Sequence, residues 1–162
     1  NGVRLTTNED GCMVVTSKAV ASGYWPPAPA SAIGRGFVAT SDLAEITPCG
    51  VRLIGRRSDA INVAGRKVPP AAIESVLLPC PQVAHCVVFG VPSTDPLRGE
   101  EIVACVNCAP SVGRPDLVAL LASSLPAWQM PRHWWLTSAI EPDERGKISR
   151  SRWRACYLES HA

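Results

Sequence analysis

The stretch from residue 37 to residue 74 constrains the fold of this chain more than any other part. Two runs with strand character, 42–47 and 51–54, flank a Pro-Cys-Gly turn. Gly50 can take the positive φ that a tight turn between paired strands requires. The pattern therefore predicts a β-hairpin over these residues.

The predicted hairpin carries one acidic and one basic side chain at its open end. Asp42 begins the first run and Arg56 follows the second, so pairing of the strands would bring the two charges face to face. A facing acid and base can hold a ligand between them, or they can form a surface ion pair that contributes little to stability. Spacing alone leaves both interpretations open.

The residues after Arg56 predict a small domain of mixed secondary structure. Gly65 lies between 60–64 and Val68, as in a second hairpin. Pro69 and Pro70 suit the first turn of a helix, because that turn does not need their missing N–H groups. The apolar positions that follow predict, in chain order, a helix with Ile73, Val76 and Leu77 on its buried face, strands at 83–91 and 101–108, a helix that begins at Pro115 and carries Leu117, Leu120, Leu121 and Leu125, a strand at 133–137, and a helix from about Ser149. This order predicts an α+β fold class.

The first 36 residues predict too little secondary structure to fold alone. One strand is expected at 12–17, and the Pro- and Ala-rich residues 28–34 are expected to form a loop. A stable sheet needs more strands than this segment provides, so we expect it to pair with the hairpin that follows.

Composition and charge argue against several functional classes. The formal net charge of +2 gives no field that would favour nucleic acid, and no apolar run approaches the ~18 residues of a membrane-spanning helix. Cys105 and Cys108 form a CxxC motif, but they lie in a predicted strand and would point to opposite faces. The seven cysteines therefore indicate small buried side chains in a reducing compartment, with no metal site.

Four motifs, in order, resemble the adenylate-forming superfamily, which comprises acyl-CoA synthetases, nonribosomal-peptide adenylation domains and luciferases. The family carries W-[FY]-R-T-G-D-L, then G-R-x-[DK]-D-x-[IV], then G-x-[RK]-[IVL] leading to I-E, and near its C-terminus G-K-[IV]-x-R. The corresponding residues here are 37–43, 55–61, 65–68 with 73–74, and 145–150. In the first motif, Ala39 and Ser41 stand where the family has arginine and glycine.

This resemblance implies that the chain has two parts. Residues 1–57 would be the β-rich C-terminal end of the large adenylation body. Residues 58–162 would be the mobile lid domain, with a three-stranded sheet flanked by helices and a β-hairpin. Ser58 would be the hinge between them, at a position where relatives carry Asp or Lys. A small polar residue can absorb the change in φ and ψ that a hinge requires.

The resemblance also implies roles for three charged side chains. Asp42 would bind the ribose hydroxyls of ATP through charge-assisted hydrogen bonds, and Arg56 would reach the ribose and the phosphate. Lys147 would contact the acyl carboxylate and the α-phosphate during adenylation, where an ammonium group neutralises developing charge. From the residues alone, Asp42 could instead cap local N–H groups, and Arg56 and Lys147 could be solvated.

The resemblance also implies a role for the second hairpin, in the step that forms the thioester. Gly65 would lie in the turn that lines the pantetheine channel, because a residue without Cβ lets a ligand approach the backbone. From the residues alone it is an ordinary hairpin glycine, and Arg66 and Lys67 could meet CoA phosphates or face water. The basic residues near the C-terminus are interpreted as a solvated helix face, with Trp153 packed inward; they are Arg145, Arg150, Arg152 and Arg154.

Together these assignments predict the C-terminal part of an ATP-dependent, carboxylate-activating ligase. The complete cytoplasmic enzyme would use ATP and Mg²⁺ to convert a carboxylic acid to an acyl-adenylate. It would then pass the acyl group to CoA or to the phosphopantetheine of a carrier protein. These residues contain no Ser/Thr/Gly-rich phosphate loop, so the chain would need the missing N-terminal adenylation body and would be inactive by itself. The alternative is a stand-alone, non-enzymatic lid-like module that docks a carrier protein or a separate ligase body.

Overall fold

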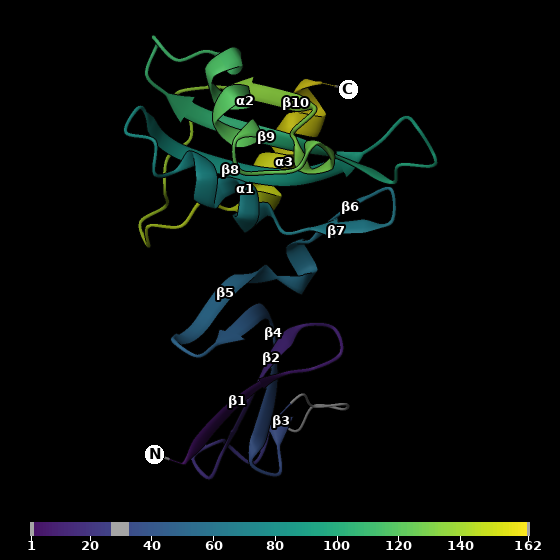
Figure 1. The fold of residues 1–162 in the computed structure, drawn as a ribbon, viewed down its shortest axis with the longest axis vertical. Helices are drawn as coiled ribbons and strands as arrows, with labels where there is room; N and C mark the ends of the chain where they lie inside the picture. Colours follow the sequence, from purple (N-terminus) through teal and green to yellow (C-terminus); the bar gives the residue numbers. More distant parts are fainter. Residues whose placement is uncertain (1, 27–32, 162) are drawn as a thin grey trace. The chain divides into compact units, whose positions relative to one another are not determined.

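The computed structural model describes residues 2–26 and 33–161. The chain forms two compact units, Asn1–Ser58 and Asp59–Ala162, which we call the first and second units and describe separately (Figure 1). Within the described part of the chain, no helix is long and apolar enough to cross a membrane.

The first unit contains a five-stranded antiparallel sheet. Its strands follow the order β1-β2-β4-β3, and β5 pairs with the C-terminal half of β4. The strand expected at 12–17 is confirmed, and it pairs with the longer strand of the hairpin, as its need for partners predicts. β1 is not predicted, because its apolar alternation is limited to Val3 and Leu5 and is too short to indicate a strand. The strands are β1 (Val3–Thr7), β2 (Cys12–Ser17), β3 (Ile33–Gly34), β4 (Phe37–Thr47) and β5 (Gly50–Arg56).

The predicted hairpin is confirmed in β4 and β5. Thr47 lies opposite Gly50, which has a φ of 140°, so the turn takes the conformation for which glycine is suited. β4 is longer than predicted, since it starts at Phe37 and also pairs with β2 and β3. Most of the loop predicted at 28–34 lies outside the described residues, and its last two residues form β3.

The second unit contains a three-stranded sheet in the order β10-β9-β8, with β9 antiparallel to β8 and parallel to β10. A separate hairpin, β6 and β7, precedes it. The α+β class and the predicted order of elements are confirmed. The elements are the 3₁₀ helix η1 (Arg57–Asp59), β6 (Ile61–Val63), β7 (Arg66–Val68), α1 (Pro70–Leu77), β8 (Val83–Pro92), β9 (Glu100–Cys108), α2 (Arg114–Ala122), the 3₁₀ helix η2 (Ala127–Gln129), β10 (His133–Leu136) and α3 (Arg150–Ser160).

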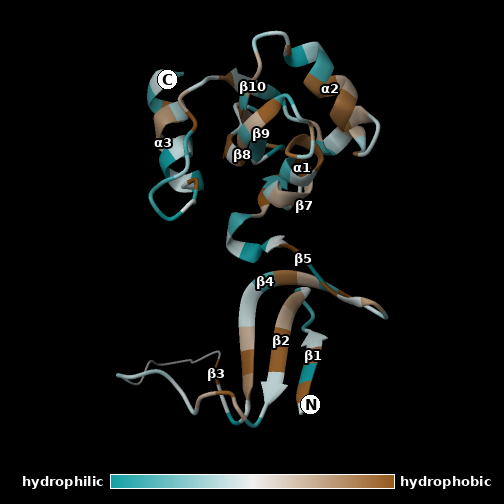
Figure 2. Ribbon diagram, turned by 90° about the vertical axis from the view of Figure 1, so that its left-hand side faces the viewer, coloured by the Kyte–Doolittle hydropathy of each residue, from teal (hydrophilic) through white to brown (hydrophobic). Residues whose placement is uncertain are grey.

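Both faces of this sheet are buried, which explains why β8 is apolar along most of its length instead of alternating. One face forms a first core with α1, α2 and the β6–β7 hairpin, and Val88 belongs to it. The other face forms a second core with α3, and the neighbouring Val87 belongs to that one. Hydrophilic and hydrophobic residues alternate along α2 (Figure 2), and its buried residues Leu117 and Leu121 belong to the first core.

Of the two predicted helices before β10, the first matches the prediction and the second is shorter than predicted. In α1, Ile73 and Leu77 are fully buried and Val76 packs beside them, as predicted. The second helix ends at Ala122 and is therefore shorter than the leucine pattern indicates. Leu125 lies beyond its end but still packs against the first core, because its N–H bonds the C=O of Leu121 at 2.8 Å and continues the helical turn.

The two cysteines of the CxxC motif lie on opposite faces of β9, as their spacing predicts. Cys105 is buried in the second core, whereas Cys108 packs against the first. Desolvation by burial raises the pKa of Cys105 to about 12, and it does the same for Cys86 in β8. A thiol with such a pKa is almost entirely protonated at neutral pH and is a poor nucleophile.

We expect Gly90→Ala to destabilise the second unit. A Cβ at Gly90 would lie 2.8 Å from Cγ2 of Ile61 and 2.7 Å from Oε1 of Glu100, inside contact distance of a packed core. Overpacking of this kind costs about 1–3 kcal/mol. Urea unfolding should show this loss, while Ala119→Leu at an exposed position of α2 should change stability by less than about 0.5 kcal/mol. Equal stability of the two variants would contradict the packing described here.

We also expect the thiols to react in an order set by burial. In the native chain at pH 8, Ellman's reagent should modify the exposed Cys49 and leave Cys86 and Cys105 unmodified. Peptide mass spectrometry would identify the modified residues, and the same reaction in urea should modify all three. Rapid modification of Cys105 in the folded chain would show that the second core is open to solvent.

Candidate functional site

Lys147 lies on an exposed turn between β10 and α3. Its N–H donates to Oδ1 of Asp143 (2.8 Å), and its C=O accepts from the N–H of Asp143 (2.9 Å). Within residues 2–26 and 33–161, its ammonium group makes no hydrogen bond or ion pair. The turn therefore fixes the main chain of Lys147 and leaves its side chain available to a ligand.

The residues after Lys147 join this turn to the body of the second unit. Ile148 packs against the second core. Ser149 is the N-cap of α3, and its hydroxyl accepts from the N–H of Arg152 at 3.4 Å. The predicted start of the C-terminal helix at Ser149 is therefore confirmed, and the lysine lies directly before a capped helix.

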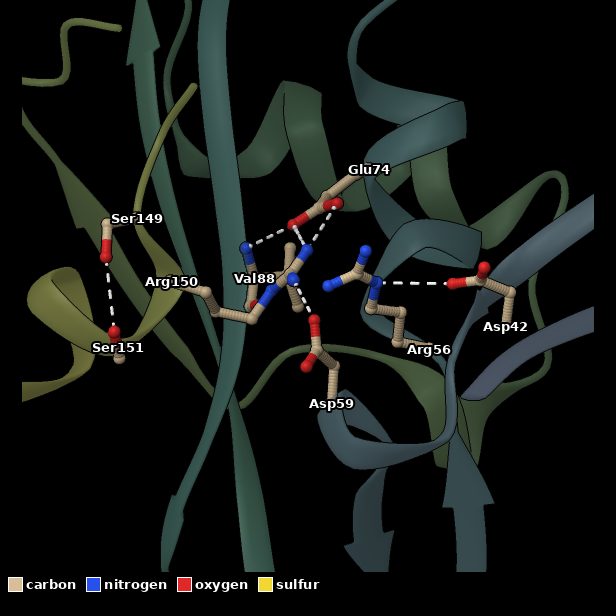
Figure 3. Close-up of polar contacts among 8 residues, drawn as sticks. All are labelled: Asp42, Arg56, Asp59, Glu74, Val88, Ser149, Arg150 and Ser151. Atoms are coloured by element: carbon tan, nitrogen blue, oxygen red, sulfur yellow. Dashed lines mark hydrogen bonds and ion pairs between the residues drawn. The ribbon is translucent and has the colours of Figure 1, made fainter. Parts of the chain in front are cut away.

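Arg150, the first residue of α3, bonds three other elements of the second unit (Figure 3). Its Nε donates to the C=O of Val88 in β8 at 2.7 Å, and one Nη donates to both carboxylate oxygens of Glu74 in α1 at 2.8 and 2.9 Å. The other Nη bonds Asp59 at the end of η1. Glu74 also accepts the N–H of Val88 at 2.8 Å. The planar fork of the guanidinium suits this set of charge-assisted bonds.

This network corrects the interpretation of Arg150 as part of a solvated helix face. Its side chain is 28% exposed and its hydrogen-bonding groups are directed inward. Arg154 also departs from that interpretation, since its Nε donates to the C=O of Gly90 at 2.8 Å. Arg152 is exposed, and Trp153 packs against the second core, as expected.

Sequence reasoning missed the network, although its acidic members lie in the quoted motifs. Arg150 is separated from Asp59 by 91 positions and from Glu74 by 76. No local periodicity connects residues so far apart. The available signal was that three different motifs each contain one of the charged residues Asp59, Glu74 and Arg150.

Asp42 and Arg56 meet across β4 and β5, as the hairpin predicts (Figure 3). Nε of Arg56 lies 3.2 Å from Oδ1 of Asp42, and the two side chains are 67% and 33% exposed respectively. Their mutual ion pair is the surface contact that the spacing allows. The hydroxyl of Thr40 accepts from the main-chain N–H of Asp42 at 3.1 Å. Binding of a nucleotide by this pair stays a prediction.

Ser58 lies in η1, at the boundary between the two units. The following residue, Asp59, belongs to the second unit and is held there by Arg150. The predicted hinge therefore has a firmly bonded residue on its C-terminal side. Movement about Ser58 stays a prediction.

The β6–β7 hairpin turns at Ala64 and Gly65, which have φ values of 51° and 80°. A Cβ at Gly65 would meet no atom within 4 Å, so the turn presents bare backbone. Arg66 stacks over the ring of Trp128 with 5.1 Å between Cζ and the ring centroid, a cation–π contact that occupies this arginine. Lys67 is exposed. Contact of these residues with pantetheine or phosphate stays a prediction.

A second polar cluster joins β9 to β10. Oε2 of Glu101 lies 2.6 Å from Nε2 of His133. Oε1 of Glu101 accepts from the Ser93 hydroxyl at 3.0 Å and from Nη1 of Arg132 at 3.1 Å. The hydrogen bond with His133 is the main reason that the pKa of Glu101 is lowered. These groups satisfy one another, so their role is structural. In the described ranges, no group of three or more His, Cys, Asp or Glu side chains could hold a metal ion.

Comparison with known sequences identifies the second unit. Residues 72–147 match the family described as AMP-binding enzyme C-terminal domain. Over 98% of its length, the chain is 33% identical to 4-coumarate–CoA ligase-like 9 from Oryza sativa subsp. japonica. Over 88% of its length, it is 32% identical to oxalate–CoA ligase from Arabidopsis thaliana. The chain spans only 29% and 28% of the lengths of these relatives.

Solved structures of the same superfamily are also similar. ATP-bound MatB from Rhodopseudomonas palustris aligns with 100% of this chain at 27% identity and a TM-score of 0.82, over 35% of its own length. The fatty acyl CoA synthetase of Mycobacterium tuberculosis aligns with 98% of this chain at 26% identity and a TM-score of 0.71, over 34% of its own length. The resemblance inferred from four motifs is confirmed, and the second unit has the fold of the small C-terminal lid domain of these enzymes. The chain thus belongs to the adenylate-forming superfamily: it carries an AMP-binding enzyme C-terminal domain and corresponds to the C-terminal part of its ligase relatives.

Proposed function

We propose that this chain is the C-terminal part of a ligase that activates a carboxylic acid with ATP and then forms a thioester. The similarity to CoA ligases and to an ATP-bound relative supports this proposal. Residues 1–57 would complete the large adenylation body, and residues 58–162 would be the mobile lid. The enzyme would be cytoplasmic. Its proposed use of ATP and CoA fits that compartment, and so do its seven cysteines, which form no disulfide among the described residues.

The unpaired ammonium of Lys147 is the observation that carries the proposal. A lysine on an ordered turn, with no protein partner in the described ranges, can form an ion pair with an incoming anion at no cost in broken bonds. Arg150 lies three residues further on and holds Asp59, the residue after Ser58. Lys147 and Asp59 therefore belong to one bonded assembly within the second unit, and rotation about Ser58 would move the lysine as part of a rigid lid.

In the first half-reaction, a carboxylate oxygen of the acid would attack the α-phosphorus of ATP, and pyrophosphate would leave. Lys147 would neutralise the negative charge that builds up on the carboxylate and phosphate oxygens. Asp42 would bind the ribose hydroxyls, with Arg56 beside it. The described residues offer no cluster for a metal ion, so the Mg²⁺ that accompanies ATP would need ligands from elsewhere in the enzyme.

In the second half-reaction, the β6–β7 turn would replace Lys147 at the reaction centre. Gly65 presents backbone without a side chain, which would let a pantetheine arm pass close to it. Lys67 is exposed and could meet a phosphate, whereas Arg66 would first have to leave Trp128. The acceptor thiol would belong to CoA or to a carrier protein.

We expect Lys147→Ala to abolish adenylation selectively in the full-length polypeptide that contains this chain. Loss of a charge-stabilising group from the transition state should lower pyrophosphate release about 10²–10³-fold. The assay would use Mg·ATP with oxalate, 4-coumarate or a medium-chain fatty acid, and thioester formation from a preformed adenylate should stay unchanged. Lys18→Ala, which removes an exposed lysine of the first unit, is the matched control.

Two results would contradict the proposal. Unchanged pyrophosphate release by Lys147→Ala would remove its assigned role. Failure of the unmodified polypeptide to release pyrophosphate with any of these acids, together with binding to a carrier protein or a separate ligase body, would favour the non-enzymatic module.

We further expect Arg150→Met to destabilise the second unit by about 2–3 kcal/mol. The substitution removes the cation that Glu74 and Asp59 share, and loss of one member of a partly buried ion-pair network is destabilising. Urea unfolding of the 162-residue chain would measure the loss. Arg152→Met, at an exposed position of the same helix, should change stability by less than about 0.5 kcal/mol.

A further inference from the structure

We propose that Asp143 is a positioning residue that holds the main chain of Lys147 for the adenylation step. The inference rests on the role proposed for Lys147 and adds a second residue to it. Asp143 would not touch the substrate. It would act by fixing the point from which the lysine side chain extends.

Asp143 binds the turn that carries Lys147 through four hydrogen bonds. Its Oδ1 accepts from the N–H of Arg145 at 2.9 Å and from the N–H of Lys147 at 2.8 Å. Its own N–H donates to the C=O of Lys147 at 2.9 Å, and its C=O accepts from the N–H of Gly146 at 2.8 Å. Both polar main-chain groups of Lys147 therefore bond to a single residue.

The geometry of the turn depends on this aspartate and on the glycine beside it. Gly146 has a φ of 72°, so the chain reverses there in a conformation that other residues rarely adopt. One carboxylate oxygen receives two N–H groups on the concave side of the turn, and bonds to an ionised acceptor are shorter and stronger than neutral ones. Without them, an exposed five-residue loop would sample many conformations.

The other end of the turn is already fixed. Ile148 packs against the second core, and Arg150 is bonded to three elements. Lys147 therefore lies between a buried side chain and the carboxylate of Asp143. Loss of Asp143 would free the lysine on one side only, so the fold of the second unit should survive. Pre-organisation of a reacting group lowers the entropy that must be lost on reaching the transition state.

The first arm of the test uses the 162-residue chain itself. Hydrogen exchange measured by NMR should rise about tenfold or more at the Arg145 and Lys147 amides in Asp143→Ala. Exchange in α3 and β8 should stay unchanged. Asp143→Asn keeps an acceptor oxygen at the same place and should restore most of the protection.

The second arm measures the two half-reactions in the full-length polypeptide. Asp143→Ala should lower kcat for pyrophosphate release about 10–100-fold with little change in KM for ATP, because the lysine is still present but poorly placed. Asp143→Asn should stay within about threefold of the unmodified enzyme. Thioester formation from preformed adenylate should be unaffected, since that step does not use Lys147 in the proposed function.

Asp95 provides a matched control. It accepts the N–H of Leu97 at 3.0 Å in the loop between β8 and β9, a similar aspartate turn in the same unit. Asp95→Ala should loosen its own loop and leave pyrophosphate release unchanged. A similar loss in both variants would indicate a general effect on the unit and would overturn the positioning role.

The outcomes separate this inference from the function on which it rests. If Lys147→Ala abolishes pyrophosphate release while Asp143→Ala raises amide exchange without lowering kcat, the aspartate is only a turn former and the inference fails. If Lys147→Ala itself leaves release unchanged, the proposed function fails. Parallel loss of protection and of kcat in Asp143→Ala, with recovery in Asp143→Asn, is the expected result.

Discussion

The guanidinium of Arg150 is the contact on which the arrangement of the second unit depends. It joins the start of α3 to β8, to Glu74 of α1 and to Asp59 of η1, elements that are far apart in sequence. The two carboxylates would repel each other without the cation between them, and the cation would be poorly solvated without the carboxylates. The network is thus stable only when all members are present, which makes it a fixed reference point for the loops around it.

The two-sided sheet explains why such an anchor is needed. Helices α1 and α2 pack on one face, whereas α3 packs on the other. Hydrophobic contact is not directional, so burial alone would let α3 slide along its face. Bonds from Arg150 to the C=O of Val88 and from Arg154 to the C=O of Gly90 fix α3 against β8 at two points. The start of α3 and the lysine before it then have a defined position relative to β8 and Asp59 within the second unit.

Local rules predicted much of the fold, because turns and caps depend on few neighbours. Gly50, Gly65 and Pro70 marked two hairpins and a helix start, and all three lie where the sequence places them. Leucine periodicity overextended α2, since Leu125 packs from a turn and not from a helix. Neither β1 nor the Arg150 network is predicted. β1 alternates only at Val3 and Leu5, which is too short a pattern, and an ion pair across 91 positions leaves no local trace. The Asp42–Arg56 contact could be predicted from the sequence, because the register of the β4–β5 hairpin places the two residues opposite each other.

The segment from Gly146 to Arg150 shows why a short motif can identify a family of large enzymes. Gly146 supplies a positive φ, Ile148 a core contact, Ser149 a helix cap and Arg150 the anchor. Each requirement admits few residue types. Among these five residues, Lys147 carries a side chain that makes no hydrogen bond, ion pair or core contact with the described chain. An exposed side chain without a partner in the described part of the chain adds little to stability, and contact of Lys147 with a ligand stays a prediction.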